Sequence, residues 1–264
     1  MKRITYLQHS LHGGKISRWP QEVMPLNIHI ADFRWYRSKG SHEAYKYKQM
    51  VKNALDAWTS ASGGVVSFNI VQNLYDSNIN LEWKRVERKS LGNCHFNFDK
   101  SGRYYSAEVQ IGLSDGIIHH KYMDEAEVYH TIIHEIGHAL GLGHSPFKGD
   151  IMYVPHQYGV TNISQSDILT LLWLYRFDIG MSEKDILNKH SNIQAPDIDA
   201  LVAQLIQEKS GFQSALENVS APQDKDLIQE TENIAELKKY LLELNNIKIN
   251  YRAPKEEKNK PPEN

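Results

Sequence analysis

Cysteine is nearly absent from this sequence: Cys94 is the single cysteine among 264 residues. One cysteine excludes an internal disulfide. Such scarcity fits a reducing compartment, and it equally fits many secreted bacterial enzymes, so it does not locate the protein.

Long apolar runs and a charge excess are missing as well. No stretch approaches the length needed to cross a bilayer, and a net charge of −2 gives no electrostatic case for nucleic acid or an anionic membrane as partner. The N-terminus has a basic pair but lacks the apolar core of roughly 7–15 residues that marks a signal peptide. The sequence therefore indicates a cytoplasmic protein or one exported by a non-classical route, and its oligomeric state is not indicated.

The most informative stretch reads H-E-x-x-H-x-x-G-x-x-H and runs from His134 to His144. His134 and His138 have the spacing that stacks two side chains on one helix face, where two imidazoles can share a metal ion. A third ligand must approach from another side, and Gly141 can end the helix and let His144 return from the loop. A free fourth position is typical of a catalytic zinc site, and Glu135 is placed to take a proton from water there.

Chance does not explain this pattern. With 13 His and 16 Gly in 264 residues, the three histidines and the glycine coincide at roughly 0.002 per chain, and the glutamate lowers this to about 10⁻⁴. The alternative is a histidine-rich helix face packed for stability. Three buried imidazoles would then each need a hydrogen-bond partner, and packing gives no reason for the glutamate or the glycine.

The motif resembles the zinc-binding signature of the metzincin metallopeptidases. The residues that follow narrow the resemblance to the matrixin branch. Ser145 directly follows the third histidine, and the segment Asp150–Tyr153 places Met152 eight residues past His144. No cysteine precedes position 94, so the sequence resembles a bacterial-type matrixin without the cysteine-switch pro-segment.

The resemblance implies a zinc-dependent endopeptidase that hydrolyses peptide bonds with one catalytic Zn²⁺. The implied metal ligands are His134, His138 and His144. The implied mechanism is attack by a zinc-activated water, with Glu135 as general base and then general acid. Met152 is the implied methionine of the turn below the metal, where it gives hydrophobic support without binding the ion.

Hydrophobic periodicity predicts the order strand, helix, strand, strand, which is typical of the start of an α/β sheet. An apolar stripe predicts a helix from Ser41 to about Ala61, and the active-site helix is expected to open near Asp124. With the resemblance, these elements predict a metzincin-like α/β (α+β) fold: a mixed, mostly parallel five-stranded twisted sheet with an antiparallel edge strand and a long active-site helix. The expected strands are Leu26–Asp32, Val65–Val71, Ile79–Trp83, Leu91–Asp99 and Ala107–Leu113.

The resemblance places the strand at Leu91–Asp99 at the sheet edge, above the zinc cleft. Its unpaired N–H and C=O groups would bind a protein or peptide substrate in extended form; the alternative is an edge covered by its own loops. The short connection Asp99–Arg103 lacks the long His-, Asp- and Gly-rich loop of vertebrate-type matrixins, so neither Ca²⁺ nor a structural Zn²⁺ is predicted. Cys94 and His95 point to opposite faces of a strand and are not expected to share an ion.

A pocket for the substrate side chain just after the scissile bond is a further implication of the resemblance. His130 precedes His134 by one helical turn and is expected to line this pocket and make it more polar. The alternative is a surface or packed histidine. Pro155 to Tyr158 is similar to the Pro-x-Tyr segment that walls the pocket in matrixins, with one residue more.

The segment Ser164–Asp167 is a capping box for the next helix, Ile168 to about Arg176. By resemblance, Asp167 hydrogen-bonds the backbone of the methionine turn. Ser166 stands where matrixins carry the acid that holds the processed N-terminus, which agrees with a chain that has no pro-segment to remove.

The resemblance is strongest over residues 124–178 and reaches back to about Trp19. Beyond it, apolar stripes predict one helix around Ile198–Ile206 and a second from about Lys225 to Leu244. The expected parts of the chain are a flexible N-terminal arm (1–18), a matrixin-like catalytic domain (19–180), a helical extension (181–252) and a disordered tail (253–264).

The extension keeps two rival functions open. One is a catalytically silent zinc-binding module that serves as an interaction platform, and the intact Glu135 argues against it. The other is a narrowly specific protease that its C-terminal helices direct to one protein target. General proteolysis that survives removal of residues 181–264 would mean that the helices only recognise or restrain.

Overall fold

The structure is a computed structural model of the chain. Its described residues all belong to the first of two compact units, Met1–Ala221 and Pro222–Asn264. The helix expected from about Lys225 to Leu244 and the tail at 253–264 therefore lie outside the described residues. None of the helices in the described part of the chain is long and apolar enough to span a bilayer. The described ranges are 4–32, 40–85, 91–113 and 125–217.

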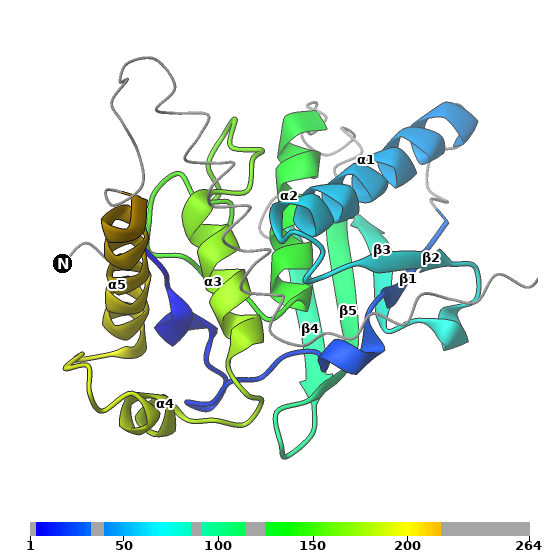
Figure 1. The fold of residues 1–264 in the computed structure, drawn as a ribbon. Coiled ribbons are helices and arrows are strands. Elements are labelled where there is room, and N and C mark those ends of the chain that lie inside the picture. The colour runs from blue at the N-terminus through cyan, green and yellow to red at the C-terminus, as the bar shows by residue number, and fades with distance from the viewer. Residues whose placement is uncertain (1–3, 33–39, 86–90, 114–124, 218–264) are drawn as a thin grey trace, which may run out of the picture. The chain divides into compact units, whose positions relative to one another are not determined.

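A five-stranded sheet with the order β2-β1-β3-β5-β4 forms the centre of the first unit (Figure 1). The pairs β1–β2, β1–β3 and β3–β5 are parallel, and β4 pairs antiparallel with β5 at the edge. This confirms the expected mixed sheet and its antiparallel edge strand. The strands are β1 (Leu26–Ile30), β2 (Phe68–Val71), β3 (Ile79–Arg85), β4 (Gly92–Phe98) and β5 (Tyr104–Leu113).

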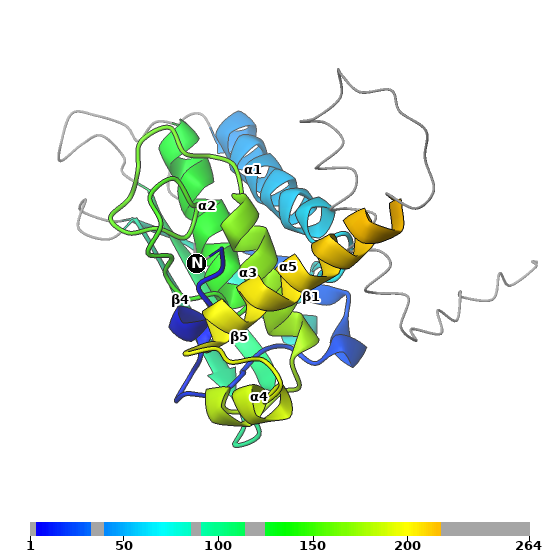
Figure 2. The same cartoon turned by 60° about the vertical axis from the view of Figure 1, so that its left-hand side comes forward.

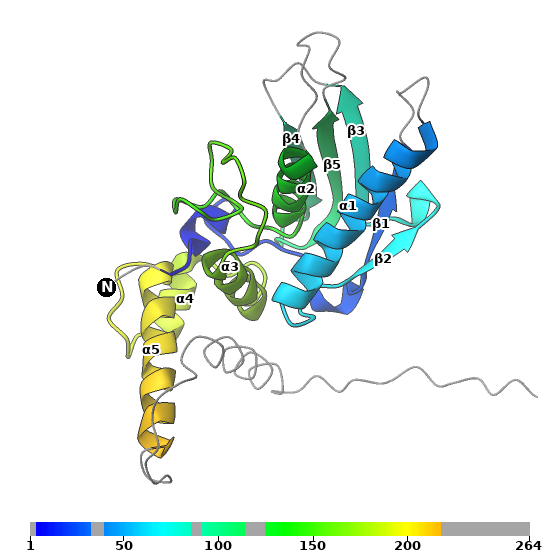
Figure 3. The same ribbon diagram turned by 90° about the horizontal axis from the view of Figure 1, so that it is seen from above.

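Helices α1 (Gly40–Ala61) and α2 (Glu125–Ala139) cover one face of this sheet, as the view from above shows (Figure 3). The two helices are joined by the indole N–H of Trp58, which donates to the Ile133 carbonyl oxygen at 3.1 Å. Burial of their apolar sides against the alternating inward residues of the strands forms the core. The core thus fixes α2, the helix of the histidine motif, beside the edge strand β4.

Three further helices lie to one side of α2 (Figures 1 and 2). They are α3 (Gln165–Arg176), α4 (Glu183–Lys189) and α5 (Ile198–Glu217). The expected capping box is present at Ser164 and Asp167, and a second one, Ser182 with Asp185, opens the short helix α4. The expected boundary at residue 180 falls inside the first compact unit, so α4 and α5 belong to the same unit as the sheet.

The N-terminal residues are packed, and the expectation of a flexible arm at 1–18 is wrong for the described residues 4–18. Tyr6, Leu7 and Ile16 are all buried in the core. This stretch is mostly polar in composition but contains a few large apolar side chains. Their burial offsets the entropy that is lost when the segment is ordered. A short 3-10 helix, η1 (Leu7–Ser10), follows the first of them.

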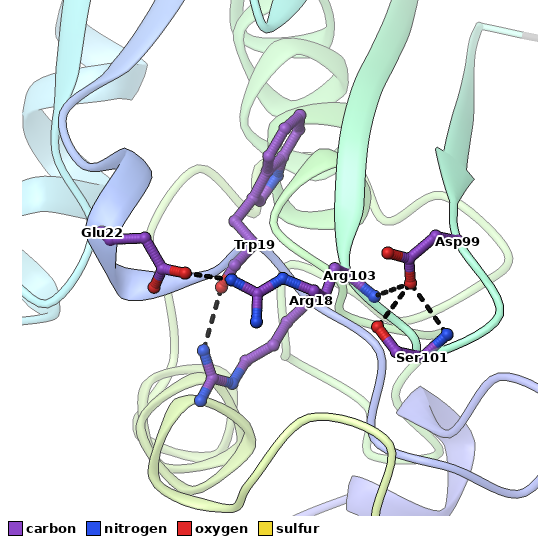
Figure 4. Close-up of polar contacts among 6 residues, drawn as sticks. All are labelled: Arg18, Trp19, Glu22, Asp99, Ser101 and Arg103. Atoms are coloured by element: carbon purple, nitrogen blue, oxygen red, sulfur yellow. Dashed lines mark hydrogen bonds and ion pairs between the residues drawn. The ribbon is translucent and has the colours of Figure 1, made fainter.

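The end of the N-terminal segment is fixed to the turn between β4 and β5 (Figure 4). The Arg18 amide donates to the Gly102 carbonyl at 3.1 Å. Within the turn, Asp99 accepts the Arg103 amide at 3.1 Å, and the Arg103 guanidinium pairs with Glu22. These contacts therefore hold the N-terminal segment just before the chain enters the first strand of the sheet.

Candidate metal centre and active-site cleft

Helix α2 presents the first two histidines of the motif and then stops abruptly. The Leu142 amide returns to the Gly137 carbonyl at 3.0 Å, and Gly141 has a φ of +102°. A side chain is strained at that φ, and a Cβ there would also lie 3.1 Å from Leu174. The chain turns at this glycine, as expected, and brings His144 back towards the helix.

The three histidines converge on one point. The Nε2 atom of His138 lies 3.1 Å from Nε2 of His134 and 3.1 Å from Nε2 of His144. Four-coordinate zinc binds imidazole nitrogens at about 2.0–2.1 Å, which puts two ligands of one ion roughly 3.3 Å apart. Among the described residues, these three form the group able to hold a metal ion. The donor set is three neutral imidazoles, which fits Zn²⁺.

The backbone orients the two helical ligands. Nδ1 of His134 faces the Ile151 carbonyl oxygen at 2.7 Å, and Nδ1 of His138 faces the Leu142 carbonyl oxygen at 2.8 Å. An N–H donated at Nδ1 leaves the lone pair on Nε2 for a metal. Burial also lowers the pKa of His134 to about 3 and that of His138 to about 4. Both rings are therefore neutral at pH 7, the form that binds a metal.

Glu135 lies in the same cleft, against the edge strand. Burial raises the pKa of its carboxyl group to about 8. A Cβ added to Gly92, the first residue of β4, would lie 2.5 Å from Oε1 of Glu135. The strand therefore approaches the carboxylate as closely as a glycine allows. Cys94, two residues further along β4, is half-buried, and burial raises the pKa of its thiol.

Met152 lies fully buried below helix α2. A Cβ on Gly137 would collide with its sulfur, so the absence of a side chain at Gly137 lets the methionine approach the helix. The turn that carries it is held from two sides: the Met152 carbonyl oxygen accepts the Ser145 amide at 2.9 Å, and Asp167 accepts the Ile151 amide at 2.9 Å. The hydrogen bond from the methionine turn to Asp167 agrees with the expectation.

Ser166 and Asp167 have different partners at the start of α3. The Ser166 hydroxyl donates to Asp150 at 3.2 Å. The second oxygen of Asp167 accepts the hydroxyl of Tyr6 at 2.6 Å. A buried tyrosine hydroxyl from the N-terminal segment thus supplies a partner on the α3 side of the site.

A cleft of about 700 Å³ contains all three candidate metal ligands and Glu135. His130 is part of its wall and makes an edge-to-face contact with His156, with ring centroids 4.1 Å apart. Pro155 and Tyr158 are not among the residues that line the cleft, and Tyr158 is 74% exposed. His156, between them in sequence, lines it instead, so the extra residue in this segment changes which side chain faces the cleft.

Comparison with protein families decides what this site is. A family model described as Matrixin matches residues 29–176, which include the whole histidine motif and the methionine turn. The chain belongs to the matrixin family. Its matrixin domain is a metalloendopeptidase domain, and the cluster of His134, His138 and His144 is consistent with the catalytic zinc of such a domain. None of the curated proteins compared with the chain matches it.

Sequence reasoning missed three histidines of the matrixin cleft: His9, His12 and His156. The first two lie in the segment expected to be flexible. The sequence did contain a signal for them. A tyrosine, a leucine and an isoleucine occur within eleven residues there, and such large apolar side chains can anchor a segment to the core. His156 was hidden by the assumption that Pro155 and Tyr158 would form the wall.

Proposed function

We propose that the protein is an endopeptidase that hydrolyses extended polypeptides in the cleft between α2 and β4. The observation that carries this proposal is the meeting of three imidazole Nε2 atoms and the buried carboxylate of Glu135 in one cleft. A site that only stored zinc would gain nothing from a buried carboxyl group with a raised pKa beside the ligands.

The metal would be held by His134, His138 and His144. When bound, Zn²⁺ lowers the pKa of water and polarises a carbonyl oxygen. The chain contributes the orientation of the ligands through the Ile151 and Leu142 carbonyl oxygens. Such hydrogen-bond partners would fix the tautomer and the orientation of the two rings and so raise the affinity for a metal.

Glu135 would move the proton. Its carboxylate takes a proton from the attacking water molecule and then gives it to the nitrogen of the leaving amine. The pKa of about 8 arises from burial without a cation nearby, and a neighbouring positive charge favours the carboxylate form. With a metal bound, the carboxylate form can take the proton, and burial of the carboxyl group helps it to hold that proton until the amine leaves.

The substrate would lie extended beside β4. Among the described strands, β4 has β5 as its neighbour on one side and stands at the edge of the sheet on the other, where a peptide main chain can add as a further strand. His130 and His156 would then form the pocket for the side chain after the scissile bond. With two imidazoles in its wall, this pocket suits a polar side chain better than a purely apolar one.

The Glu135→Ala substitution tests the proposal. We expect the variant to bind one zinc per chain, as wild type does, and to lose at least ~100-fold in the rate of peptide cleavage, because general-base catalysis is worth this much or more. Metal content and cleavage of casein and of a peptide library measure the two properties separately. Zinc-loaded wild type that cleaves no peptide, or a variant that cleaves like wild type, would contradict the proposal.

A further inference from the structure

The N-terminal segment forms part of the wall of the cleft. The Ser10 hydroxyl accepts the Gly143 amide at 3.0 Å, one residue before the ligand His144. A Cβ added to Gly143 would collide with the carbonyl group of His9. The main chain at residues 9–10 therefore lies directly against the loop that carries the third ligand, and His9 and His12 both line the cleft.

The ring of His12 packs against aromatic side chains of the edge strand β4 and of β5. Its ring centroid is 4.6 Å from that of Phe96, and the rings of Phe98 and Tyr104 follow at 6.0 and 6.1 Å. Phe98 is 41% exposed, so the aromatic surface continues into solvent. Nε2 of His12 is buried and has no hydrogen-bond partner. An unpaired polar atom at the side of an aromatic surface is unusual in a packed protein and suits a ligand.

The two ends of the cleft lie on opposite sides of the metal ligands. His130, His134 and His138 follow one another along α2 at steps of one turn, about 5.4 Å each. His130 contacts His156 at one end. His12 lies at the other end, because the segment that carries it contacts Gly143, the residue before the ligand His144.

We propose that His12 and Phe96 form a binding site for an aromatic side chain of the substrate, on the amino-terminal side of the scissile bond. That the site lies before the scissile bond rests on the proposed function, in which the pocket at His130 binds the side chain after that bond. An incoming tyrosine or phenylalanine ring packs on Phe96 and Phe98, and a tyrosine hydroxyl can also bond with Nε2 of His12. Pairs of aromatic rings prefer offset or edge contacts of the kind this surface offers.

Asp199 is the positioning residue for this wall. It lies in the first turn of α5 and is only 2% exposed. Its carboxylate accepts the Thr5 hydroxyl at 2.7 Å, the Leu7 amide at 2.6 Å and the Gln8 amide at 3.2 Å. Through the three hydrogen bonds that it accepts, this buried carboxylate holds the residues that precede His9, and α5 thereby helps to position the part of the cleft wall formed by His9 and His12.

Cleavage of matched peptides tests the site. The peptides share one sequence after the scissile bond and carry Tyr, Phe or Ala at each of three positions before it. We expect wild type to prefer the aromatic peptide over the alanine peptide at one position, by roughly three- to tenfold in kcat/KM. Phe96→Ala should bring this ratio close to one, His12→Ala should remove the advantage of the Tyr peptide over the Phe peptide, and His190→Ala, at the end of α4 outside the cleft, should leave both ratios unchanged. A ratio of one in wild type, an aromatic-to-alanine ratio that survives in Phe96→Ala, or a Tyr-to-Phe advantage that survives in His12→Ala overturns the proposal.

Asp199→Asn separates positioning from folding. We expect this variant to lower the same Tyr-to-Ala ratio while the preference after the scissile bond and the zinc content stay as in wild type. Asp178→Asn, which removes an exposed partner of Lys189, is the matched control and should change neither preference. A fall in overall activity with an unchanged ratio would assign Asp199 a purely structural role and overturn this part of the proposal.

Peptide binding tests the site without turnover. Calorimetric titration of zinc-loaded Glu135→Ala with the Tyr and Ala peptides measures the same discrimination as a ratio of dissociation constants. Tighter binding of the Tyr peptide that disappears in Glu135→Ala/Phe96→Ala supports the site even if wild type cleaves no peptide, the outcome that would refute the proposed function. Equal binding of the two peptides overturns it.

Discussion

At the scale of single residues, the metal ligands couple the protein to pH even before a metal binds. Burial lowers the pKa of His134 to about 3 and that of His138 to about 4, whereas an imidazole in the unfolded chain titrates near 6.5. Between these values the unfolded chain binds protons that the folded one does not. The linkage relation then requires the free energy of unfolding to fall as the pH drops below about 6.5.

We therefore expect the metal-free Glu135→Gln variant to lose stability on mild acidification. Glu135 is replaced because the raised pKa of its carboxyl group, about 8, makes the folded wild type bind a proton over the same pH range and offsets the two histidines. At pH 5, His134 and His138 should each cost about 2 kcal/mol relative to pH 7.5, since each pH unit between the folded and unfolded pKa values is worth ~1.4 kcal/mol. Urea denaturation in the presence of a chelator at pH 7.5, 6 and 5 measures this, and adding His134→Gln should remove about half of the pH dependence. A Glu135→Gln midpoint that is the same at pH 5 and 7.5 would show that the two rings accept protons in place.

At the scale of elements, α3 supports the metal centre through a carboxylate at its first turn. Asp167 is fully buried and joins three parts of the chain: the hydroxyl of Tyr6, the Ile151 amide and its own capping partner Ser164. The carbonyl oxygen of Ile151 in turn orients His134. A displacement of this backbone turn is therefore transmitted to a metal ligand.

Asp167→Asn should weaken zinc binding more than it weakens the fold. The amide oxygen can still accept the Ile151 and Ser164 amides, but it carries no charge, and the NH₂ group then faces the Tyr6 hydroxyl, which has to accept instead of donate. Loss of a group that orients a ligand typically costs 10- to 100-fold in metal affinity, and we expect a loss of that order. Competition with a chromophoric chelator measures it. Asp185→Asn, in the equivalent capping box of α4, is the control and should keep wild-type affinity.

The elements nearest the motif are also those that the sequence predicts best. The spacing of His134, His138 and Gly141 determines a helix and its end by local geometry alone, and the edge strand followed from alternation combined with the family resemblance. Contacts between segments that are distant in the sequence could not be predicted from it. Nothing local to Asp199 says that it accepts the Leu7 amide 192 residues away, and the polar composition of residues 8–15 concealed the anchors on either side of them.

At the scale of the whole molecule, the first and last described segments of the first unit hold each other. The Ile16 amide bonds with the Met181 carbonyl oxygen at 2.9 Å, and Asp199 holds the backbone of Leu7. On the buried side of α5, Ile198, Leu201 and Val202 are fully covered. Residues beyond 180 are therefore part of the body that carries the cleft, even though the family match ends at residue 176.

Two truncations distinguish a packed extension from a separable one. A chain that ends at residue 180 loses α4, α5 and the three hydrogen bonds of Asp199, whereas a chain that ends at residue 221 keeps all of the first compact unit. Burial of a large aliphatic side chain is worth about 1.5–3 kcal/mol. We expect the shorter chain to lose more than ~3 kcal/mol in the free energy of unfolding and to become sensitive to trypsin at Lys15 and Arg18.

The longer chain, 1–221, should have the same free energy of unfolding as the first compact unit has in the full-length protein. It should also keep the zinc affinity and the aromatic preference of the full-length protein. Denaturant titration followed by tryptophan fluorescence suits both, because Trp19, Trp58 and Trp173 are buried within the unit. If the 1–180 chain matches 1–221 in stability and in cleavage preference, the N-terminal segment holds its position without α5. The cleft wall would then be set by Tyr6 and Asp167 alone, and Asp199 would have no part in specificity.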